Sequence, residues 1–254
     1  MAGAVILKSK NTLVAGRSPI ALGDALHLDA SRAVSVNGVV NLPDYLNSSR
    51  IFTPMPGQNG NAGFVPASPV IQTVGGFEEL NFPKGAGLAA PYDALSGAAG
   101  ATIYLVLRAT LSGADVNGVI FRWMSKYTGV GATDQGFLLR KYGSASSIQW
   151  LIDWGANSSS MSQVFSRTDY VVVCIGWSIA NNISFFNING VEVTNTMPAT
   201  SPVGGGLMSF GYSPDYANMQ CEMGLRTVLG YGAYHDATTR AAMIQKLMGE
   251  NGLR

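Results

Sequence analysis

The sequence predicts an all-β sandwich closed by one short C-terminal helix, and three local signals carry this prediction. An Asn-Gly pair at Asn189-Gly190 separates two runs of β-branched and aromatic residues, which is a strong signal for a β-hairpin. Asn37-Gly38 is a second such pair, between two valine-rich segments. Asp236 opens the one convincing amphipathic helical segment of the chain.

The first part of the chain is expected to contain an arm, short strands and a long loop-rich stretch. Residues 1–23 are expected to form an extended arm with one possible strand at Ala4–Lys8, and the ordered body is expected to start at Leu26–Leu28. Prolines and glycines between residues 47 and 76 exclude long regular elements there. Phe77–Phe82 then reads as a short strand.

The middle of the chain is expected to form an antiparallel meander. Ala101–Thr110 is apolar on both faces, as a central strand of a sandwich should be. Three further strands are expected at Gly118–Lys126, Gly136–Tyr142 and Ser147–Asp153.

The last third is expected to contain a hairpin, one long strand and the closing helix. Tyr170–Ser178 and Ile183–Ile188 read as strands before the Asn189-Gly190 turn, and Met219–Tyr234 reads as one long strand. Asp236 can cap the helix, whose end falls at Gly249 or Gly252. We expect the helix to bury a stripe formed by Ala237, Ala241, Ile244 and Met248.

The composition describes a chain with a large core and a nearly neutral surface. Apolar residues make up 47% of the 254 residues, charged residues only 12%, and the formal net charge is +1. Such a balance argues against electrostatic attraction to nucleic acid or acidic membranes. No stretch approaches the apolar length of a membrane span, so we expect no membrane insertion. A neutral surface suits both extracellular binding modules and subunits that are covered by neighbours.

The N-terminus and the cysteines bear on where the protein acts. In MAGAVILKSK the positive charges follow the apolar run, which is the wrong order for a signal peptide. We therefore expect synthesis in the cytoplasm without a signal peptide. Cys174 and Cys221 are expected to be buried free thiols, although two cysteines can also form one bridge.

The order of these segments resembles that of the concanavalin A-like lectin/glucanase superfamily, and of its laminin G-like modules in particular. The likeness is carried by segments at residues 26–31, 79–82, 85–88, 102–108, 176–177, 187–193 and 226–246. The resemblance implies a jelly-roll domain of two curved antiparallel sheets over residues 24–254, preceded by the arm at residues 1–23. It also implies that any ligand lies on the concave sheet or on the loop rim.

Catalytic and metal-binding groupings are not evident in the sequence. Retaining glucanases place two carboxylates close together, whereas Glu78 and Glu79 are adjacent and would face opposite sides of a strand. The two histidines, His27 and His235, lack metal-ligand spacing. We therefore expect a protein that is not an enzyme, with no cofactor and no metal.

The candidate binding residues are Trp150, Asp153, Trp154 and Asn157. The two tryptophans can stack on sugar rings, while Asp153 and Asn157 supply polar contacts. The alternative is that both tryptophans belong to the core, because they alternate with Ile148 and Ile152.

The sequence leaves two functions open, with a hydrolase as a third alternative that would need paired carboxylates from distant strands. The first is a structural subunit of a tailed-phage virion, in capsid decoration, tail or baseplate, which contacts other virion proteins and copies of itself through its arm. Its localisation would be the virion. The second is a carbohydrate-binding, lectin-like module that contacts glycans on the host surface.

Overall fold

The computed structural model describes residues 26–58, 61–92, 95, 97–109, 118–124, 135–142, 147–154, 158–164, 169–197, 207–215 and 219–253. The expected arm at residues 1–23 lies outside these ranges.

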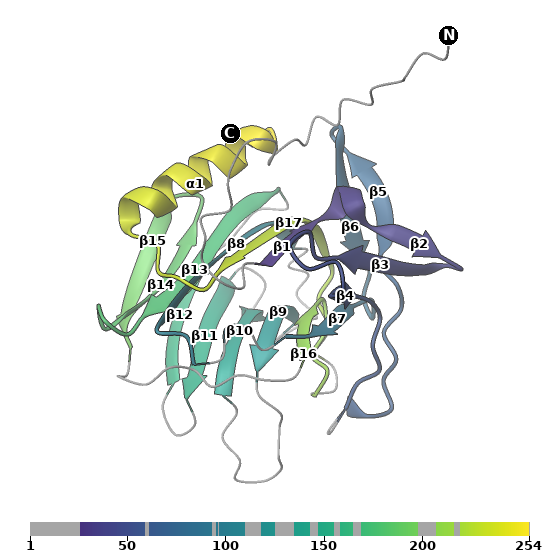
Figure 1. Ribbon diagram of the computed structural model, residues 1–254, viewed down its shortest axis with the longest axis horizontal. Helices are drawn as coiled ribbons and strands as arrows, with labels where there is room; N and C mark the ends of the chain where they lie inside the picture. Colours follow the sequence, from purple (N-terminus) through teal and green to yellow (C-terminus); the bar gives the residue numbers. More distant parts are fainter. Residues whose placement is uncertain are drawn as a thin grey trace.

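The described residues form two large antiparallel sheets, one small antiparallel sheet and a C-terminal helix (Figure 1). The eight-stranded sheet has the order β15-β14-β13-β8-β17-β6-β5, and β1 lies beside the second half of β17. Its strands are β1 (Leu26–Asp29), β5 (Val70–Val74), β6 (Phe77–Phe82), β8 (Gly100–Ala109), β13 (Val171–Ser178), β14 (Ile183–Ile188), β15 (Val191–Thr196) and β17 (Met223–Tyr231).

The second sheet has six strands in the order β12-β11-β10-β9-β16-β7. They are β7 (Leu88–Pro91), β9 (Val119–Met124), β10 (Gln135–Tyr142), β11 (Ser147–Trp154), β12 (Ser158–Val164) and β16 (Leu207–Phe210). The small sheet consists of β2 (Val34–Val36), β3 (Val39–Pro43) and β4 (Ile51–Phe52), and a short 3-10 helix, η1 (Ala30–Arg32), connects β1 to β2.

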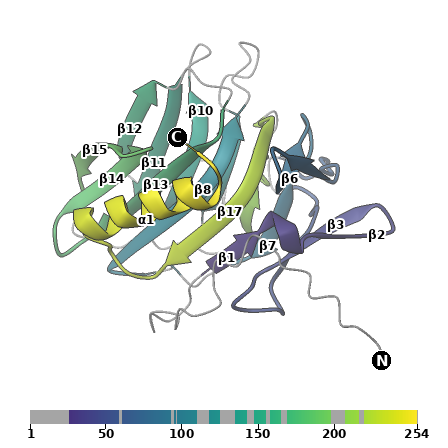
Figure 2. The same cartoon turned by 90° about the horizontal axis from the view of Figure 1, so that it is seen from above.

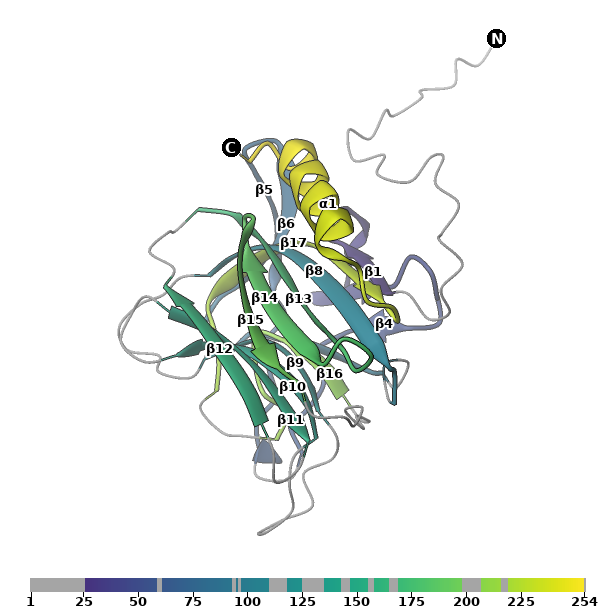
Figure 3. The same ribbon diagram turned by 90° about the vertical axis from the view of Figure 1, so that its left-hand side faces the viewer.

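The two large sheets pack face to face around one apolar core (Figure 3). The eight-stranded sheet contributes Ile103, Leu105 and Leu107 from β8, and the six-stranded sheet contributes Phe121 and Phe137, whose rings lie 5.3 Å apart. Burial of such side chains is the main term that favours folding. The predicted all-β sandwich with one C-terminal helix is confirmed.

One side of the sandwich is joined by side chains that cross from one sheet to the other. Gln163 of β12 donates to the carbonyl oxygens of Phe186 (2.8 Å) and Val191 (3.1 Å). Asn195 of β15 donates back to the carbonyl of Ser160 (3.4 Å). These bonds link β12 of the six-stranded sheet to β14 and β15 of the eight-stranded sheet.

Helix α1 (Ala237–Glu250) lies on the outer face of the eight-stranded sheet, above β13, β14 and β8 (Figure 2). Asp236 caps it as predicted, because its carboxylate accepts a hydrogen bond from the Thr239 N–H at 2.7 Å. The expected buried stripe is only partly correct. Ala237 and Ala241 are exposed, and the residues that the helix buries are Arg240, Ile244 and Leu247.

The contacts of Arg240 explain why the buried face of the helix differs from the expected stripe. Its guanidinium donates to both carboxylate oxygens of Glu192 on β15 (2.9 and 2.5 Å), and it lies 4.1 Å from the ring centroid of Phe185. A bidentate ion pair placed on an aromatic ring satisfies a buried charge. The helix therefore turns a charged residue, rather than two alanines, toward the sheet.

Both Asn-Gly turns are confirmed. Asn37 and Gly38 have φ angles of 52° and 79°, and Asn189 and Gly190 have φ angles of 50° and 94°. Two successive positive φ angles define the turn that suits the twist of a two-residue hairpin. The long strand predicted at Met219–Tyr234 is shorter than expected, since β17 covers Met223–Tyr231 and the preceding residues belong to a loop. The helix in the described part of the chain is not long and apolar enough to cross a bilayer.

Candidate functional site

A buried carboxylate fixes the turn that follows β3. Asp44 is 1% exposed, and its Oδ1 accepts hydrogen bonds from the backbone N–H groups of His27 (3.1 Å) and Leu46 (3.0 Å). Its Oδ2 pairs with Arg50 Nη1 at 2.6 Å. A buried charge is tolerated when donors of this kind surround it, and here they tie β1 to both ends of the turn.

Arg50 in turn connects this carboxylate to the core. Its guanidinium carbon lies 4.5 Å from the ring centroid of Tyr92, which is a cation–π distance. The carbonyl of Tyr92 accepts a hydrogen bond from Trp123 Nε1 at 2.5 Å, and Trp123 is fully buried. The turn at residues 44–50 is therefore anchored on both sides.

This anchored turn presents the ring of Tyr45 to solvent. Its side chain is 46% exposed, and it is the only exposed aromatic side chain among those whose burial the structure describes. The backbone N–H of Tyr45 donates to the carbonyl of His27 at 2.8 Å. An exposed aromatic ring on a fixed backbone is a ready contact surface.

Two polar side chains lie against the Tyr45 ring. The guanidinium carbon of Arg32, an exposed residue of η1, lies 4.5 Å from the ring centroid, and the His27 ring lies 5.1 Å away. Asn47, Ser48 and Ser49 of the same turn are also exposed. We call Arg32, Tyr45 and residues 47–49 the Tyr45 surface.

His27 supports this surface from below. It is nearly buried, and its Nε2 has no hydrogen-bond partner among the described residues. Burial lowers the pKa of His27, and this effect outweighs the opposing influence of Asp29 and Asp44. The imidazole under Tyr45 is therefore neutral at neutral pH.

The four residues predicted to bind a glycan are not brought together by any described contact. Trp150 is fully buried and packs at a centroid distance of 5.3 Å against Phe137, so it belongs to the core and cannot stack on a sugar. Its neighbours Asp153 and Trp154 lie on β11, but their side chains are outside the described part of the structure. Asn157 lies outside the described residues altogether.

The strand register directs Trp150 into the core. In the register of the meander, Trp150 is paired with Leu139, which also faces the core. The alternation along β11 therefore points Trp150 inward together with Ile148. The alternative reading of the sequence, that this tryptophan is core, is the correct one for Trp150.

The titratable groups beneath helix α1 are buried and stabilise the packing of the helix. Beneath helix α1, the hydroxyl of Tyr104 lies 2.8 Å from His235 Nδ1. Burial raises the pKa of both Tyr104 and the Cys174 thiol, so both groups stay protonated and are poor nucleophiles. Neither Cys174 nor Cys221 forms a disulfide.

Two further acidic residues in the described ranges pair with arginines. Glu79 is buried and pairs with Arg108 (2.8 Å), while Asp215 pairs with Arg122 (2.5 Å). Within the described residues, no group of three or more His, Cys, Asp or Glu side chains is placed to hold a metal ion.

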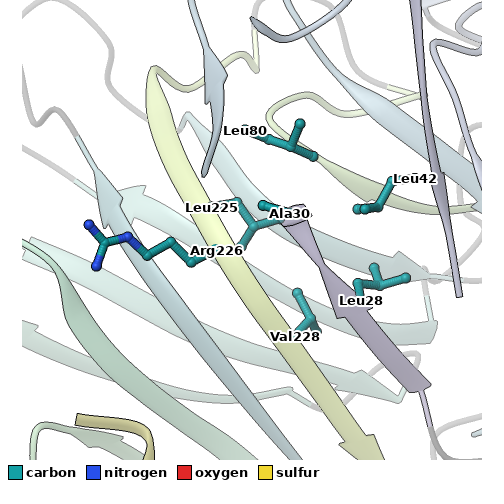
Figure 4. A pocket seen from close by; sticks show the side chains of 7 residues that line it. All are labelled: Leu28, Ala30, Leu42, Leu80, Leu225, Arg226 and Val228. Carbon is teal, nitrogen blue, oxygen red and sulfur yellow. The ribbon is translucent and has the colours of Figure 1, made fainter. Parts of the chain in front are cut away.

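One apolar space lies between the eight-stranded sheet and the segment that leads into β2 (Figure 4). Arg226 points to the opposite side of β17, away from the apolar side chains of this space. The space is too narrow for a water molecule, so it reflects the packing of aliphatic side chains and is not a ligand site. It is lined by Leu28, Ala30, Leu42, Leu80, Leu225, Arg226 and Val228.

Comparison with known proteins identifies the class of fold. No protein-family model matches the chain, and no curated protein does. Among solved structures, the chain is similar to the ligand-binding domain of botulinum neurotoxin serotype D in complex with N-acetylneuraminic acid. The TM-score is 0.59 at 12% identity, covering 88% of this chain and 50% of that one.

Two further structures give the same picture. The binding domain of botulinum neurotoxin serotype G has a TM-score of 0.57 at 13% identity, covering 87% of this chain and 50% of the other. The receptor-binding domain of the C/D mosaic serotype has a TM-score of 0.58 at 11% identity, with 88% and 51% covered. At such identities the likeness shows a shared β-sandwich fold alone, and the chain spans about half the length of these structures. The laminin G-like resemblance and the phage origin remain predictions.

Proposed function

We propose that the protein is a carbohydrate-binding, lectin-like module that engages glycans through the Tyr45 surface. The observation that carries this proposal is the exposed ring of Tyr45, which is held in place by the buried Asp44 carboxylate and has the Arg32 guanidinium over one of its faces. The apolar face of a sugar ring stacks on an aromatic ring, while its hydroxyl groups need nearby hydrogen-bond partners. Arg32 and the exposed turn at residues 47–49 supply such partners.

The comparisons support the same class of function. Several of the similar structures are described as binding domains, one in complex with N-acetylneuraminic acid, and another is described in terms of cell entry that depends on two ganglioside molecules. Because fold alone does not transmit a binding site, the proposal rests on the local geometry of this chain. As part of the same proposal, the protein is not an enzyme.

A glycan array tests the proposal. We expect the wild-type protein to bind a defined set of glycans, and Tyr45→Ala to lose that binding while it keeps its thermal unfolding temperature. Val191→Ala, which changes another exposed apolar side chain, serves as the matched control and should bind like the wild type. Wild-type protein that binds no glycan on the array would overturn the function.

A second variant distinguishes failure of the proposed site from failure of the proposed function. Trp154→Ala tests the surface that the sequence predicted. Loss of binding in Trp154→Ala together with unchanged binding in Tyr45→Ala would keep the function and move the site to β11.

The virion-subunit hypothesis stays a prediction, with its localisation in the virion and its contacts to other virion proteins. Its central element, the arm at residues 1–23, lies outside the described residues.

A further inference from the structure

The small sheet of β2, β3 and β4 carries apolar side chains on both faces, although only one face is buried. On the inner face, Val40, Leu42 and Phe52 belong to the core. The pairing register places Val36 opposite Val39, and Val34 on the same face of β2 as Val36. The same alternation places Asn41, which pairs with Val34, and then Pro43, which pairs with Ile51 of β4, on this outer face.

This outer face is exposed to solvent. Val34, Val36, Val39 and Ile51 are 52%, 55%, 42% and 45% exposed. We call these four residues the valine face. Nine large apolar side chains in the described part of the chain are exposed, and the valine face holds four of them. A concentration of exposed apolar side chains on one small sheet is typical of an interaction surface.

The valine face ends at an open strand edge. Among the described residues β2 pairs with β3 only, and the hairpin projects from the body of the sandwich (Figures 1 and 2). Exposed edges usually carry a lysine, a proline or a bulge that prevents pairing, and Val34-Ser35-Val36 has none of these.

The hairpin geometry shows which backbone groups this edge offers. In a two-residue hairpin the residues beside the turn exchange both backbone hydrogen bonds, so Val36 directs its N–H and C=O toward β3. Ser35, one residue earlier, directs its own groups to the free edge. In agreement, its cross-strand neighbour Val40 donates its N–H to the hydroxyl of Ser68 (2.9 Å), away from β2.

We infer that two copies of this chain pair antiparallel through their β2 edges, about a two-fold axis at Ser35. This register lets the two Ser35 residues exchange two N–H···O bonds, and it places Val34 of one copy opposite Val36 of the other. The edge is uncharged, and in this register Arg32 falls opposite Gly38, so no like charges meet. The two valine faces then lie on the same side of one six-stranded sheet.

The expected dimer is weak, because a three-residue strand buries little area. Sedimentation velocity over a concentration series should show wild-type protein shifting from monomer to dimer, with a dissociation constant roughly in the micromolar to millimolar range. Val36→Lys should remain monomeric throughout, because a lysine on the edge blocks pairing. Val191→Lys, at an exposed position of β15, is the control and should dimerise like the wild type. Circular dichroism and thermal melts establish that both variants are folded.

Cross-linking tests the register. Ser35→Cys treated with a short thiol-reactive cross-linker should give a covalent dimer, whereas Val191→Cys should not. The native Cys174 and Cys221 are buried and should not react. A wild-type protein that stays monomeric at the highest soluble concentration would overturn the inference. Dimerisation that appears only after residues 1–23 are deleted would overturn it too, since it would show that the arm of the same chain covers β2.

Discussion

Asp44 is the residue on which the Tyr45 surface depends, because its carboxylate holds the turn from which Tyr45 projects. Replacing it with Ala removes the acceptor for two backbone N–H groups and leaves Arg50 without its carboxylate partner. Breaking a nearly buried pair in this way should lower the free energy of unfolding by about 3 kcal/mol. Urea denaturation measures this change. Asp44→Asn keeps an acceptor oxygen and should lose less, and equal losses in the two variants would contradict the role of the charge.

Gly224 is a second position at which a small substitution should lower the free energy of unfolding. A Cβ added there would lie 2.5 Å from Glu79 Oε2 and 3.0 Å from Arg108 Nε, so Gly224→Ala should displace the buried Glu79–Arg108 pair. We expect a loss of about 1–3 kcal/mol in unfolding free energy. Gly63→Ala is the matched control, because a Cβ at that position meets no atom within 4 Å. Equal stability of the two variants would show that the pair adapts without loss.

At the scale of the element, the two histidines make the attachment of β1 and α1 sensitive to pH. Burial lowers the pKa of His27, and it also lowers the pKa of His235, which lies just before helix α1. The charged groups that act on them are Asp29, Asp44 and Arg32 for His27, and Asp236 and Arg240 for His235.

The sign of the effect follows from linkage. The unfolded chain takes up protons near the ordinary pKa of 6.5, whereas the folded chain does so only at lower pH. Stability should therefore be fully present above pH 6.5 and fall as the pH drops from there toward the folded-state pKa values. Urea denaturation between neutral and mildly acidic pH measures the slope. The double variant His27→Gln/His235→Gln should show a shallower slope, and an unchanged slope would assign the acid sensitivity to other groups.

Elements whose pattern is set by local chemistry could be predicted from sequence. The two Asn-Gly turns were correct because their positive φ angles are a property of those residues themselves. The cap at Asp236 was correct for the same reason. Strand β12 was not predicted, because it is a serine-rich edge strand whose Ser160 and Ser162 are exposed and whose apolar contribution is little more than Met161.

Positions set by tertiary partners could not be predicted. Arg240 faces the sheet because it forms an ion pair with Glu192 of β15. The periodicity of the helix sequence does not reveal a partner on a distant strand. For Trp150 the sequence leaves both a sugar-binding and a core position open, and the register of β11 decides for the core. The Tyr45 surface was missed altogether. Its only sequence signal was an aromatic residue after Asp44 in a polar turn, and its exposure depends on contacts with β1.

At the scale of the whole molecule, dimerisation through β2 would join two Tyr45 surfaces in one particle. In each copy the Tyr45 surface lies on the segment between β1 and β4, which also contains β2. A dimer with two linked sites would bind a densely glycosylated surface more tightly than a free sugar. We therefore expect Val36→Lys to bind a free glycan like the wild type but to be retained less on a surface coated with that glycan. Surface plasmon resonance at high and low glycan density measures the difference. Equal retention at both densities would separate the dimer from the binding function.

The most direct test of the account is the affinity of three proteins for the best glycan from the array, measured by isothermal titration calorimetry. We expect Tyr45→Phe to stay close to the wild type, since it keeps the ring, and Tyr45→Ala to bind about tenfold more weakly or worse, because it loses the stacking surface. A Tyr45→Ala protein that binds with the affinity of the wild type would contradict the assignment of the Tyr45 surface as the glycan site.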